Sequence, residues 1–198
     1  FGTTAGFINN IVTKFGIEVS YVSQTDLSEW RAAVKENTKL LFLETPSNPL
    51  NEVADLEALS EIAHAAGALL VVDNSFLSPV GQQPLKHGAD ISVQSATKAI
   101  DGHGRVMGGV LSGSEELMTQ VAMYCNSCGL AMSPFNAWVL LSGVETLSVR
   151  MEKQFAGALK IARWLSEQPQ VKAVYYSGLP SHPQAALAAK QQLGGGIV

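Results

Sequence analysis

The sequence predicts an α/β fold with a mostly parallel β-sheet and helices on both of its faces. Short apolar runs alternate along the chain with segments of helical periodicity, and several of these runs stop abruptly on polar residues. Continuously apolar strands separated by helices are typical of parallel sheets, because both faces of such sheets are buried. Ligands bind such sheets beyond the carboxyl ends of the strands, so the polar strand ends are candidates for a site.

Helices are expected where apolar side chains recur roughly every three to four residues. In chain order they are predicted at residues 7–15, 26–34, 55–66, 114–132, 134–141 and 147–165. Asp26, Asp55 and Ser114 are side chains that cap helix N-termini, and Gly16 and Gly67 are placed as C-caps. The last helix is the longest, and a helix of this length often connects two domains.

Strands are expected where short apolar or alternating runs are rich in leucine, isoleucine and valine. They are predicted at residues 17–22, 39–43, 68–72, 90–98, 106–111 and 171–175, and Gly194 to Val198 is typical of a turn followed by another strand. Polar or reactive groups end three of the runs, at residues 44–48, 73–75 and 95–98. Parallel pairing would bring these groups to one edge of the sheet.

The composition excludes several classes of protein. With 198 residues, 46% of them hydrophobic, the chain can bury a core without disulfides. The net charge of −4 and the scattered basic residues lack the basic stripe of a nucleic-acid-binding protein. No apolar run approaches the ~20 residues that span a bilayer, and no signal peptide is recognisable. We therefore expect a cytoplasmic protein without nucleic-acid or membrane partners.

The chain is expected to comprise a large domain and part of a second one. Residues 1–145 would form the large domain, without its N-terminal part. Residues 146–198 would supply the long linking helix and an incomplete C-terminal α/β domain, whose first strand is predicted at residues 171–175.

Metal and redox sites are disfavoured. Cys125 and Cys128 form a C-x-x-C pair, but a structural zinc ion needs about four ligands, and no second pair exists in the sequence. The histidines have no metal-ligand spacing, and only one lies near the polar strand ends; they are His64, His87, His103 and His182. We expect no metal, and His103 is more typical of a loop histidine than of a catalytic one.

Two other enzyme classes are also disfavoured. The glycine pattern at residues 102–108 is similar to a dinucleotide fingerprint, but it precedes a predicted strand where the fingerprint would follow one. A serine hydrolase would need a G-x-S-x-G nucleophile elbow, which the sequence lacks.

The groups at the strand ends suit pyridoxal phosphate. Lys98 alone is equally compatible with a solvent-exposed loop residue. Asp73 and Lys98 follow two buried strands, so an amine and a carboxylate are expected at one sheet edge. A lysine can bind the cofactor covalently, and a carboxylate keeps its pyridine nitrogen protonated. Ser95 and Thr97, two apart on a strand end, would point the same way and donate to phosphate oxygens.

Several motifs resemble one family in order and spacing. They are Glu-Thr-Pro-Ser-Asn-Pro at residues 44–49, Val-Asp-Asn-Ser-Phe-Leu-Ser-Pro at residues 72–79, and Ser-Ala-Thr-Lys at residues 95–98 followed by Gly-His-Gly at residues 102–104. The chain is similar over essentially its whole length to the Cys/Met-metabolism family of pyridoxal-phosphate enzymes. This resemblance implies an aspartate-aminotransferase-like large domain, the fold type I of these enzymes, and pyridoxal 5′-phosphate as the cofactor.

The resemblance also implies roles for individual residues. Lys98 corresponds to the Schiff-base lysine and is the catalytic residue, and Asp73 corresponds to the partner of the pyridine nitrogen. Ser95 and Thr97 correspond to phosphate ligands, and Ser75 is included among the cofactor-binding residues.

Asn48 corresponds to the asparagine near the cofactor's phenolic oxygen and the substrate carboxylate. Phe1 stands where most members have a tyrosine stacked on the cofactor, so it can stack but has no hydroxyl for acid–base chemistry. Arg105 stands where the wider family usually has an acidic residue, which favours the sulfhydrylase branch.

The activity implied by this branch is γ-replacement, in which O-succinylhomoserine and sulfide give homocysteine and succinate in methionine biosynthesis. Cystathionine γ-synthase and methionine or cystathionine γ-lyase remain alternatives. Family members are homo-oligomers, dimers or tetramers, and contain flanking segments that complete the phosphate and substrate sites. The chain alone is therefore expected to be poorly active, and a catalytically incomplete folded partner is the alternative of another class.

Overall fold

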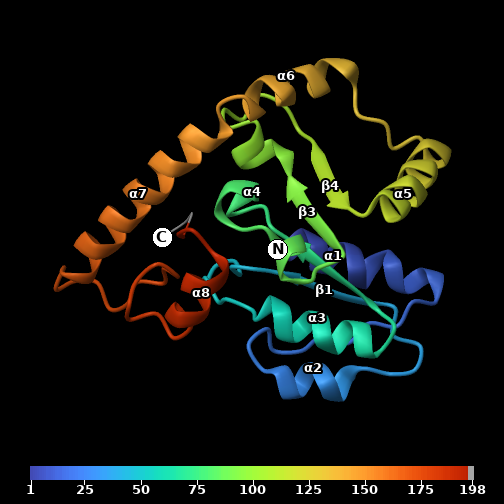
Figure 1. The fold of residues 1–198 in the computed structure, drawn as a ribbon, viewed down its shortest axis with the longest axis horizontal. Coiled ribbons are helices and arrows are strands. Elements are labelled where there is room, and N and C mark those ends of the chain that lie inside the picture. Colours follow the sequence, from blue (N-terminus) through green and yellow to red (C-terminus); the bar gives the residue numbers. More distant parts are fainter. Residues whose placement is uncertain (196–198) are drawn as a thin grey trace.

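A four-stranded β-sheet with the strand order β1-β2-β3-β4 is at the centre of the structure, a computed structural model that describes residues 1–195 (Figure 1). Its strands are β1 (Leu40–Glu44), β2 (Leu69–Asp73), β3 (Ile91–Ser95) and β4 (Gly109–Gly113). The pairs β1·β2 and β2·β3 are parallel, and β4 runs antiparallel to β3. The predicted α/β fold with a mostly parallel sheet is therefore confirmed.

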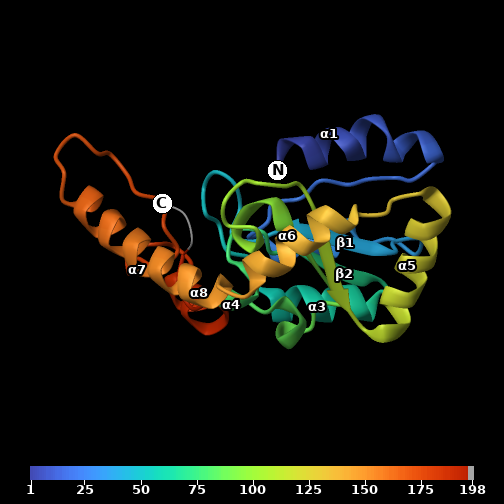
Figure 2. The same cartoon turned by 90° about the horizontal axis from the view of Figure 1, so that it is seen from above.

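Helices make up most of the remaining structure. They are α1 (Gly2–Asn10), η1 (Val12–Phe15), α2 (Leu27–Ala33), α3 (Leu56–Ala65), α4 (Ser78–Gly81), η2 (Pro84–His87), η3 (Ala96–Ile100), α5 (Glu115–Cys128), α6 (Pro134–Val144), α7 (Leu147–Ser166) and α8 (Ala185–Gln191). In Figure 2, α1 and α3 lie on opposite sides of β1 and β2. The predicted caps are present: the side chains of Asp26, Asp55 and Ser114 each accept a hydrogen bond from a backbone N–H in the first turn of α2, α3 and α5.

The main core lies between the sheet and helices α2 and α3. Alternate residues of the strands point to this face, as the period of a strand requires. The cluster contains Trp30, Leu41, Leu43, Ala54, Leu56, Leu59, Ile62, Ala63, Ala68, Leu70, Val72 and Ala89. Burial of these side chains holds β1 and β2 against α3 and so fixes where the two strands end.

A second core cluster forms around the segments that leave β2 and β3. Ala96 and Ile100 of η3 pack with residues of α6 and α7 and with the loop after β2. The cluster contains Leu77, Ala96, Ile100, Leu140, Leu147, Met151 and Phe155. The long helix α7 therefore packs against the polypeptide that carries Lys98.

Two predicted strands are wrong. Residues 17–22 and 171–175 are irregular in the structure. Their alternating patterns are genuine, but a strand also needs a hydrogen-bonding neighbour, and none pairs with either segment within residues 1–195. Residues 17–22 are mostly exposed, as expected for a segment outside the sheet.

Other elements differ from prediction in their limits. The first helix begins at Gly2, and its predicted second half is the separate turn η1. The strand predicted at residues 106–111 is shifted to Gly109–Gly113, the segment that pairs with residues 91–95 of β3. Helix α8 was not predicted, and the strand expected at Ile197 and Val198 lies outside the described residues.

Among residues 1–195, no helix combines the length and the apolar character that are needed to cross a membrane. The proposed division into residues 1–145 and 146–198 stays a prediction. It would place the boundary immediately before α7 begins at Leu147.

The substitution Leu59→Ala in the full-length protein is expected to lower the free energy of unfolding by about 2–5 kcal/mol. Leu59 is fully buried in the main core, so the change removes apolar contacts and leaves a cavity. Denaturant unfolding measures the effect. Leu85→Ala is the control, because Leu85 is 42% exposed and should lose no more than about 0.5 kcal/mol. Equal losses in the two variants would contradict the described core.

Candidate active site

The carboxyl ends of the three parallel strands meet at one edge of the sheet. Glu44, the last residue of β1, lies opposite Asp73, the last residue of β2. Asp73 in turn lies opposite Val93, two residues before the end of β3. The polar groups that were predicted at this edge from their strand ends are therefore brought together.

The Asp73 carboxylate is positioned by Ser75. Oδ1 of Asp73 accepts hydrogen bonds from Ser75 N–H at 3.0 Å and from Ser75 Oγ at 2.6 Å. The Ser75 hydroxyl oxygen also accepts a hydrogen bond from the backbone N–H of Ser95 at 2.7 Å. Ser75 is buried, and it thereby connects the carboxylate at the end of β2 to the end of β3.

Lys98 lies in the turn η3, which follows β3 directly. Its backbone angles, φ −92° and ψ −112°, interrupt the helical geometry of this turn. The side chain is exposed, and the amine has no hydrogen bond or ion pair with residues 1–195. Nζ lies 5.5 Å from the centroid of the Phe1 ring and 4.9 Å from that of Phe76. Both rings are close enough for a cation–π interaction with the ammonium group.

Phe76 was not identified from the sequence as a site residue, although it lies in the motif that follows β2. Residues 75–77 form a turn after β2, so no strand alternation was available to indicate that its ring would face Lys98.

Ser95 and Thr97 are not two residues apart on one strand, as was predicted. β3 ends at Ser95, and Thr97 belongs to the turn that follows. Thr97 Oγ1 accepts a hydrogen bond from Gly108 N–H at 3.1 Å, with the Gly108 carbonyl also within 3.4 Å. The Ser95 hydroxyl makes no hydrogen bond within the described part of the chain. Of the two hydroxyls, that of Ser95 is the one with no hydrogen-bond partner among residues 1–195.

Asn48 lies in the turn after β1, where its side chain is exposed. Its segment is at the same sheet edge as Asp73, but no contact in residues 1–195 joins its side chain to Lys98. His103 is exposed, and its backbone N–H rather than its ring takes part in the network around Asp101.

A buried carboxylate organises the loop after Lys98. Asp101 is fully buried and accepts hydrogen bonds from the backbone N–H of Arg105 at 2.7 Å, from Arg105 Nε at 2.9 Å and from His103 N–H at 3.3 Å. These hydrogen bonds lower the pKa of the Asp101 carboxyl, and the largest effect comes from the backbone N–H of Arg105. The carboxylate therefore stays charged at neutral pH, and its stabilising effect is lost only as the pH falls through the lowered pKa.

A buried amide network lies behind the site and was not predicted. Gln82 donates to the Thr45 carbonyl at 2.9 Å and to Asn74 Oδ1 at 3.1 Å, and its own Oε1 accepts from Gln192 Nε2 at 2.9 Å. The network connects the loop after β1 and the residue after Asp73 to the segment that ends α8. Amide side chains give no sequence signal of burial, because glutamine and asparagine are usually exposed.

Within residues 1–195, no group of three or more His, Cys, Asp or Glu side chains is placed to hold a metal ion. Cys125 and Cys128 are free thiols on α5, with Cys128 exposed.

Comparison with known proteins identifies related sequences and structures. The family described as Cys/Met metabolism PLP-dependent enzyme matches residues 1–198. An O-succinylhomoserine sulfhydrylase from Pseudomonas aeruginosa is 54% identical over 198 residues, which are 100% of this chain and 49% of that protein. A chloroplastic cystathionine β-lyase from Arabidopsis thaliana is 45% identical over 199 residues, covering 100% of this chain and 43% of that protein.

A solved structure of cystathionine γ-lyase from Lactobacillus plantarum, in complex with L-serine, superimposes with a TM-score of 0.96 at 34% identity. The match covers 98% of this chain and 52% of that one. The chain thus spans about half the length of the curated relatives that it matches.

The substitution Ser75→Ala is expected to destabilise the full-length protein by about 1–3 kcal/mol. It leaves the partly buried Ser95 N–H without its acceptor and removes one of the two donors to Asp73 Oδ1. Denaturant unfolding measures the loss. Ser148→Ala serves as the matched control, because Ser148 is exposed on α7. If both serines were equally dispensable, Ser75 would not connect the strand ends as described.

Proposed function

The chain belongs to the Cys/Met metabolism family of PLP-dependent enzymes, and we propose that the whole protein catalyses γ-replacement on O-succinylhomoserine. In this reaction, sulfide sulfur forms a bond to Cγ, the Cγ–O ester bond breaks, and homocysteine and succinate are released. The observation that carries the proposal is the 54% identity to an O-succinylhomoserine sulfhydrylase, together with an amine and a carboxylate at one sheet edge.

The residues present fit pyridoxal phosphate. The Lys98 amine is exposed and has no polar partner among residues 1–195, so it is available to an aldehyde. Both hydrogen bonds from Ser75 go to Oδ1 of Asp73, so Oδ2 is available to bind a ring nitrogen. The aromatic ring of Phe1, 5.5 Å from the amine, offers a face for stacking. An amine, a carboxylate and an aromatic face are the groups this cofactor needs.

When bound, pyridoxal phosphate withdraws electrons from the α carbon of an amino-acid substrate. We assign to Lys98 the removal and return of protons at the α and β carbons, because a neutral amine is a suitable base once it is free. Asp73, held by Ser75, would keep a proton on the ring nitrogen. Ser95 and Thr97 would donate to the phosphate. Thr97 Oγ1 could keep the hydrogen bond that it accepts from Gly108 N–H, and its donation to the phosphate would replace only the 3.4 Å contact with the Gly108 carbonyl.

Asn48 is assigned to the substrate side of the site. Its exposed amide in the turn after β1 can donate a hydrogen bond to a substrate carboxylate. Phe1 lacks a hydroxyl, so it stacks but moves no proton. This difference from a tyrosine disfavours elimination routes that need a second acid or base.

Cystathionine γ-synthase and methionine or cystathionine γ-lyase activities are the alternatives. The 45% identity to a cystathionine β-lyase and the structural similarity to a cystathionine γ-lyase are the observations that support a lyase activity. Arg105, which pairs with the buried Asp101, is the residue of this chain that favours the sulfhydrylase branch.

The remaining features of the proposal concern the whole protein. We propose a cytoplasmic homo-oligomer, a dimer or tetramer, that acts on a small amino-acid substrate and sulfide. Large exposed apolar side chains on α5 and on α6 support self-association, since buried contacts with another subunit would remove them from solvent. They are Met123, Tyr124, Phe135, Trp138 and Leu141. The other class of function, a catalytically incomplete folded partner, predicts no cofactor binding.

Replacing Lys98 by alanine is expected to abolish the visible absorption of the enzyme-bound cofactor in the full-length protein. The change removes the only amine proposed to react with the cofactor aldehyde. Absorption spectra of the purified variant measure this. Lys153→Ala, at an exposed position of α7, should leave the band in place. A visible band that Lys98→Ala leaves unchanged would contradict the assignment of Lys98. If the unsubstituted protein showed no visible band with pyridoxal phosphate, the non-catalytic partner would be favoured.

Substrate competition is expected to give homocysteine from O-succinylhomoserine and sulfide faster than cystathionine from O-succinylhomoserine and cysteine. Methionine alone should be cleaved more slowly than either. Product quantification under matched concentrations measures the three rates. Faster formation of cystathionine would transfer the assignment to γ-synthase, and faster methionine cleavage would transfer it to γ-lyase.

A further inference from the structure

The carbonyl groups that follow Lys98 are not paired as they would be in a continuous helix. In an α-helix, the Ala99 carbonyl would accept a hydrogen bond from the N–H of His103, four residues later. That N–H instead donates to the Asp101 carboxylate at 3.3 Å, as does the N–H of Arg105 at 2.7 Å. The chain turns away after Asp101, and the carbonyls of Ala99 and Ile100 need other donors.

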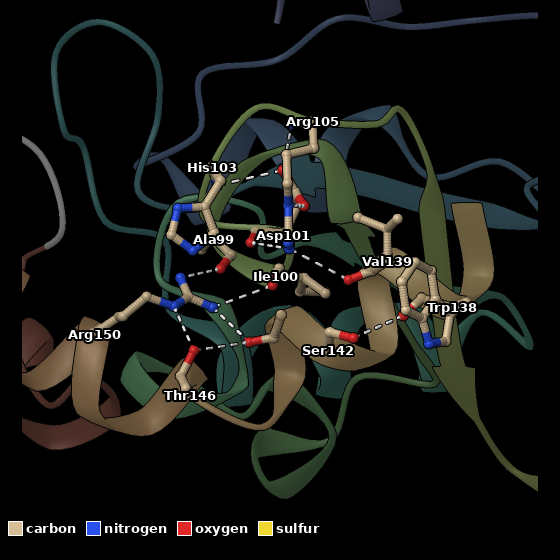
Figure 3. A network of polar contacts seen from close by, with 11 residues as sticks. Ala99, Ile100, Asp101, His103, Arg105, Trp138, Val139, Ser142, Thr146 and Arg150 are labelled. Atoms are coloured by element: carbon tan, nitrogen blue, oxygen red, sulfur yellow. Dashed lines mark hydrogen bonds and ion pairs between the residues drawn. The ribbon is translucent and has the colours of Figure 1, made fainter. Parts of the chain in front are cut away.

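Arg150 supplies these donors from helix α7. Its Nη1 donates to the Ala99 carbonyl at 2.7 Å, and its Nη2 donates to the Ile100 carbonyl at 3.2 Å. Figure 3 shows the guanidinium group pointing at both carbonyls. The accepting groups belong to the first and second residues after Lys98, so the guanidinium binds the backbone that carries the lysine.

The guanidinium group is itself held on its other side. Nη2 also donates to the Gly143 carbonyl at 2.7 Å, near the end of α6, and Nε donates to Thr146 Oγ1 at 3.1 Å. The planar arrangement of donors in arginine allows one side chain to reach several acceptors at once. Arg150 therefore connects the α6–α7 junction rigidly to the Lys98 turn.

Two glycines make room for this arrangement. A Cβ atom on Gly143 would lie 2.3 Å from the Ile100 carbonyl oxygen, and one on Gly102 would lie 2.1 Å from Arg150 Nη1. Gly102 also has φ +75°, which side chains rarely tolerate. The backbone is thus adapted at both positions to the close approach of α6 and of the guanidinium group.

Apolar packing holds the same turn from the core side. Ala96 and Ile100 are buried in the cluster that includes Leu147 and Met151 of α7. The side chain of Lys98 points out of this cluster, toward Phe1 and Phe76. The turn is fixed on both sides of the lysine, while the amine itself is left without a polar partner in the described residues.

We propose that Arg150 is a positioning residue for Lys98: its hydrogen bonds to the Ala99 and Ile100 carbonyls hold the turn that aims the amine at the cofactor aldehyde. The inference rests on the proposed role of Lys98. The hydrogen bonds of Arg150 go to three backbone carbonyls and to Thr146 Oγ1, so in this role it acts on Lys98 through the backbone. It also makes the presentation of the lysine depend on the position of α7.

The test measures how fast the cofactor-free full-length protein captures pyridoxal phosphate, followed by the appearance of visible absorption. Arg150→Ala is expected to slow capture about tenfold, which corresponds to about 1.4 kcal/mol in the barrier. Arg150→Lys should be intermediate, because one ammonium group cannot serve both carbonyls and the α6–α7 junction. Added guanidinium ion at low millimolar concentration should restore part of the rate of Arg150→Ala, which a general loss of stability would not allow.

Arg163→Ala is the matched control, since Arg163 is exposed near the other end of the same helix, and its capture rate should stay within about twofold of the unsubstituted protein. Thermal unfolding of each cofactor-free variant is recorded in parallel. Capture by Arg150→Ala at the unsubstituted rate, with or without a lower melting temperature, would overturn the inference. If Arg150→Ala does not fold, an unchanged rate in Arg150→Lys overturns it and a slowed rate supports it.

Lys98→Ala in the same assay distinguishes a failure of the role of Arg150 from a failure of the proposed function. Loss of the band in Lys98→Ala with normal capture in Arg150→Ala would refute only the role of Arg150. Retention of the band in Lys98→Ala would refute the proposed function itself.

Discussion

The parallel pairing of β1, β2 and β3 is the constraint on which the candidate site depends. Parallel strands end at the same edge of a sheet, and the register places Glu44 opposite Asp73 and Asp73 opposite Val93. The core beneath β1 and β2 makes this register costly to change, because a shift of one residue would turn the buried leucines and valines toward the other face. Residues far apart in the sequence thereby form one group of polar side chains.

The segments that leave the strands are held more firmly than their loop character suggests. Ser75 connects Asp73 to the end of β3. Gln82 joins the loops after β1 and β2 to the end of α8. Asp101 accepts hydrogen bonds from N–H groups of the loop after Lys98. Each is a buried polar group with its partners in place, as such groups must be in a protein interior. Their common effect is to fix the backbone at the sheet edge, while the Lys98 amine has no polar partner among residues 1–195.

Helix α7 packs against both the Lys98 turn and the C-terminal segment of the described chain. Its N-terminal region packs on the Lys98 turn through Leu147 and Met151 and binds it through Arg150. Ala162, further along the same helix, packs with Tyr176 and Leu179 of the C-terminal segment. Helix α7 therefore contacts both the Lys98 turn and the C-terminal segment.

The sequence by itself determined the α/β class, the apolar strands, the capped helices and the polar groups at the strand ends, because these depend on local periodicity and on short-range hydrogen bonds such as that of Asp55. It also predicted Asp73 and Lys98 as site residues from their motifs, and their roles stay predictions. Only the tertiary structure decided that residues 17–22 and 171–175 are not strands, since strand formation requires a neighbour that local alternation does not reveal. It likewise placed Thr97 beyond the end of β3, against Gly108, and brought Phe76 to Lys98 and Arg150 to the Ala99 carbonyl. Arg150 lies 51 residues from Ala99 along the chain, and no sequence pattern specifies which carbonyl a distant guanidinium group will meet.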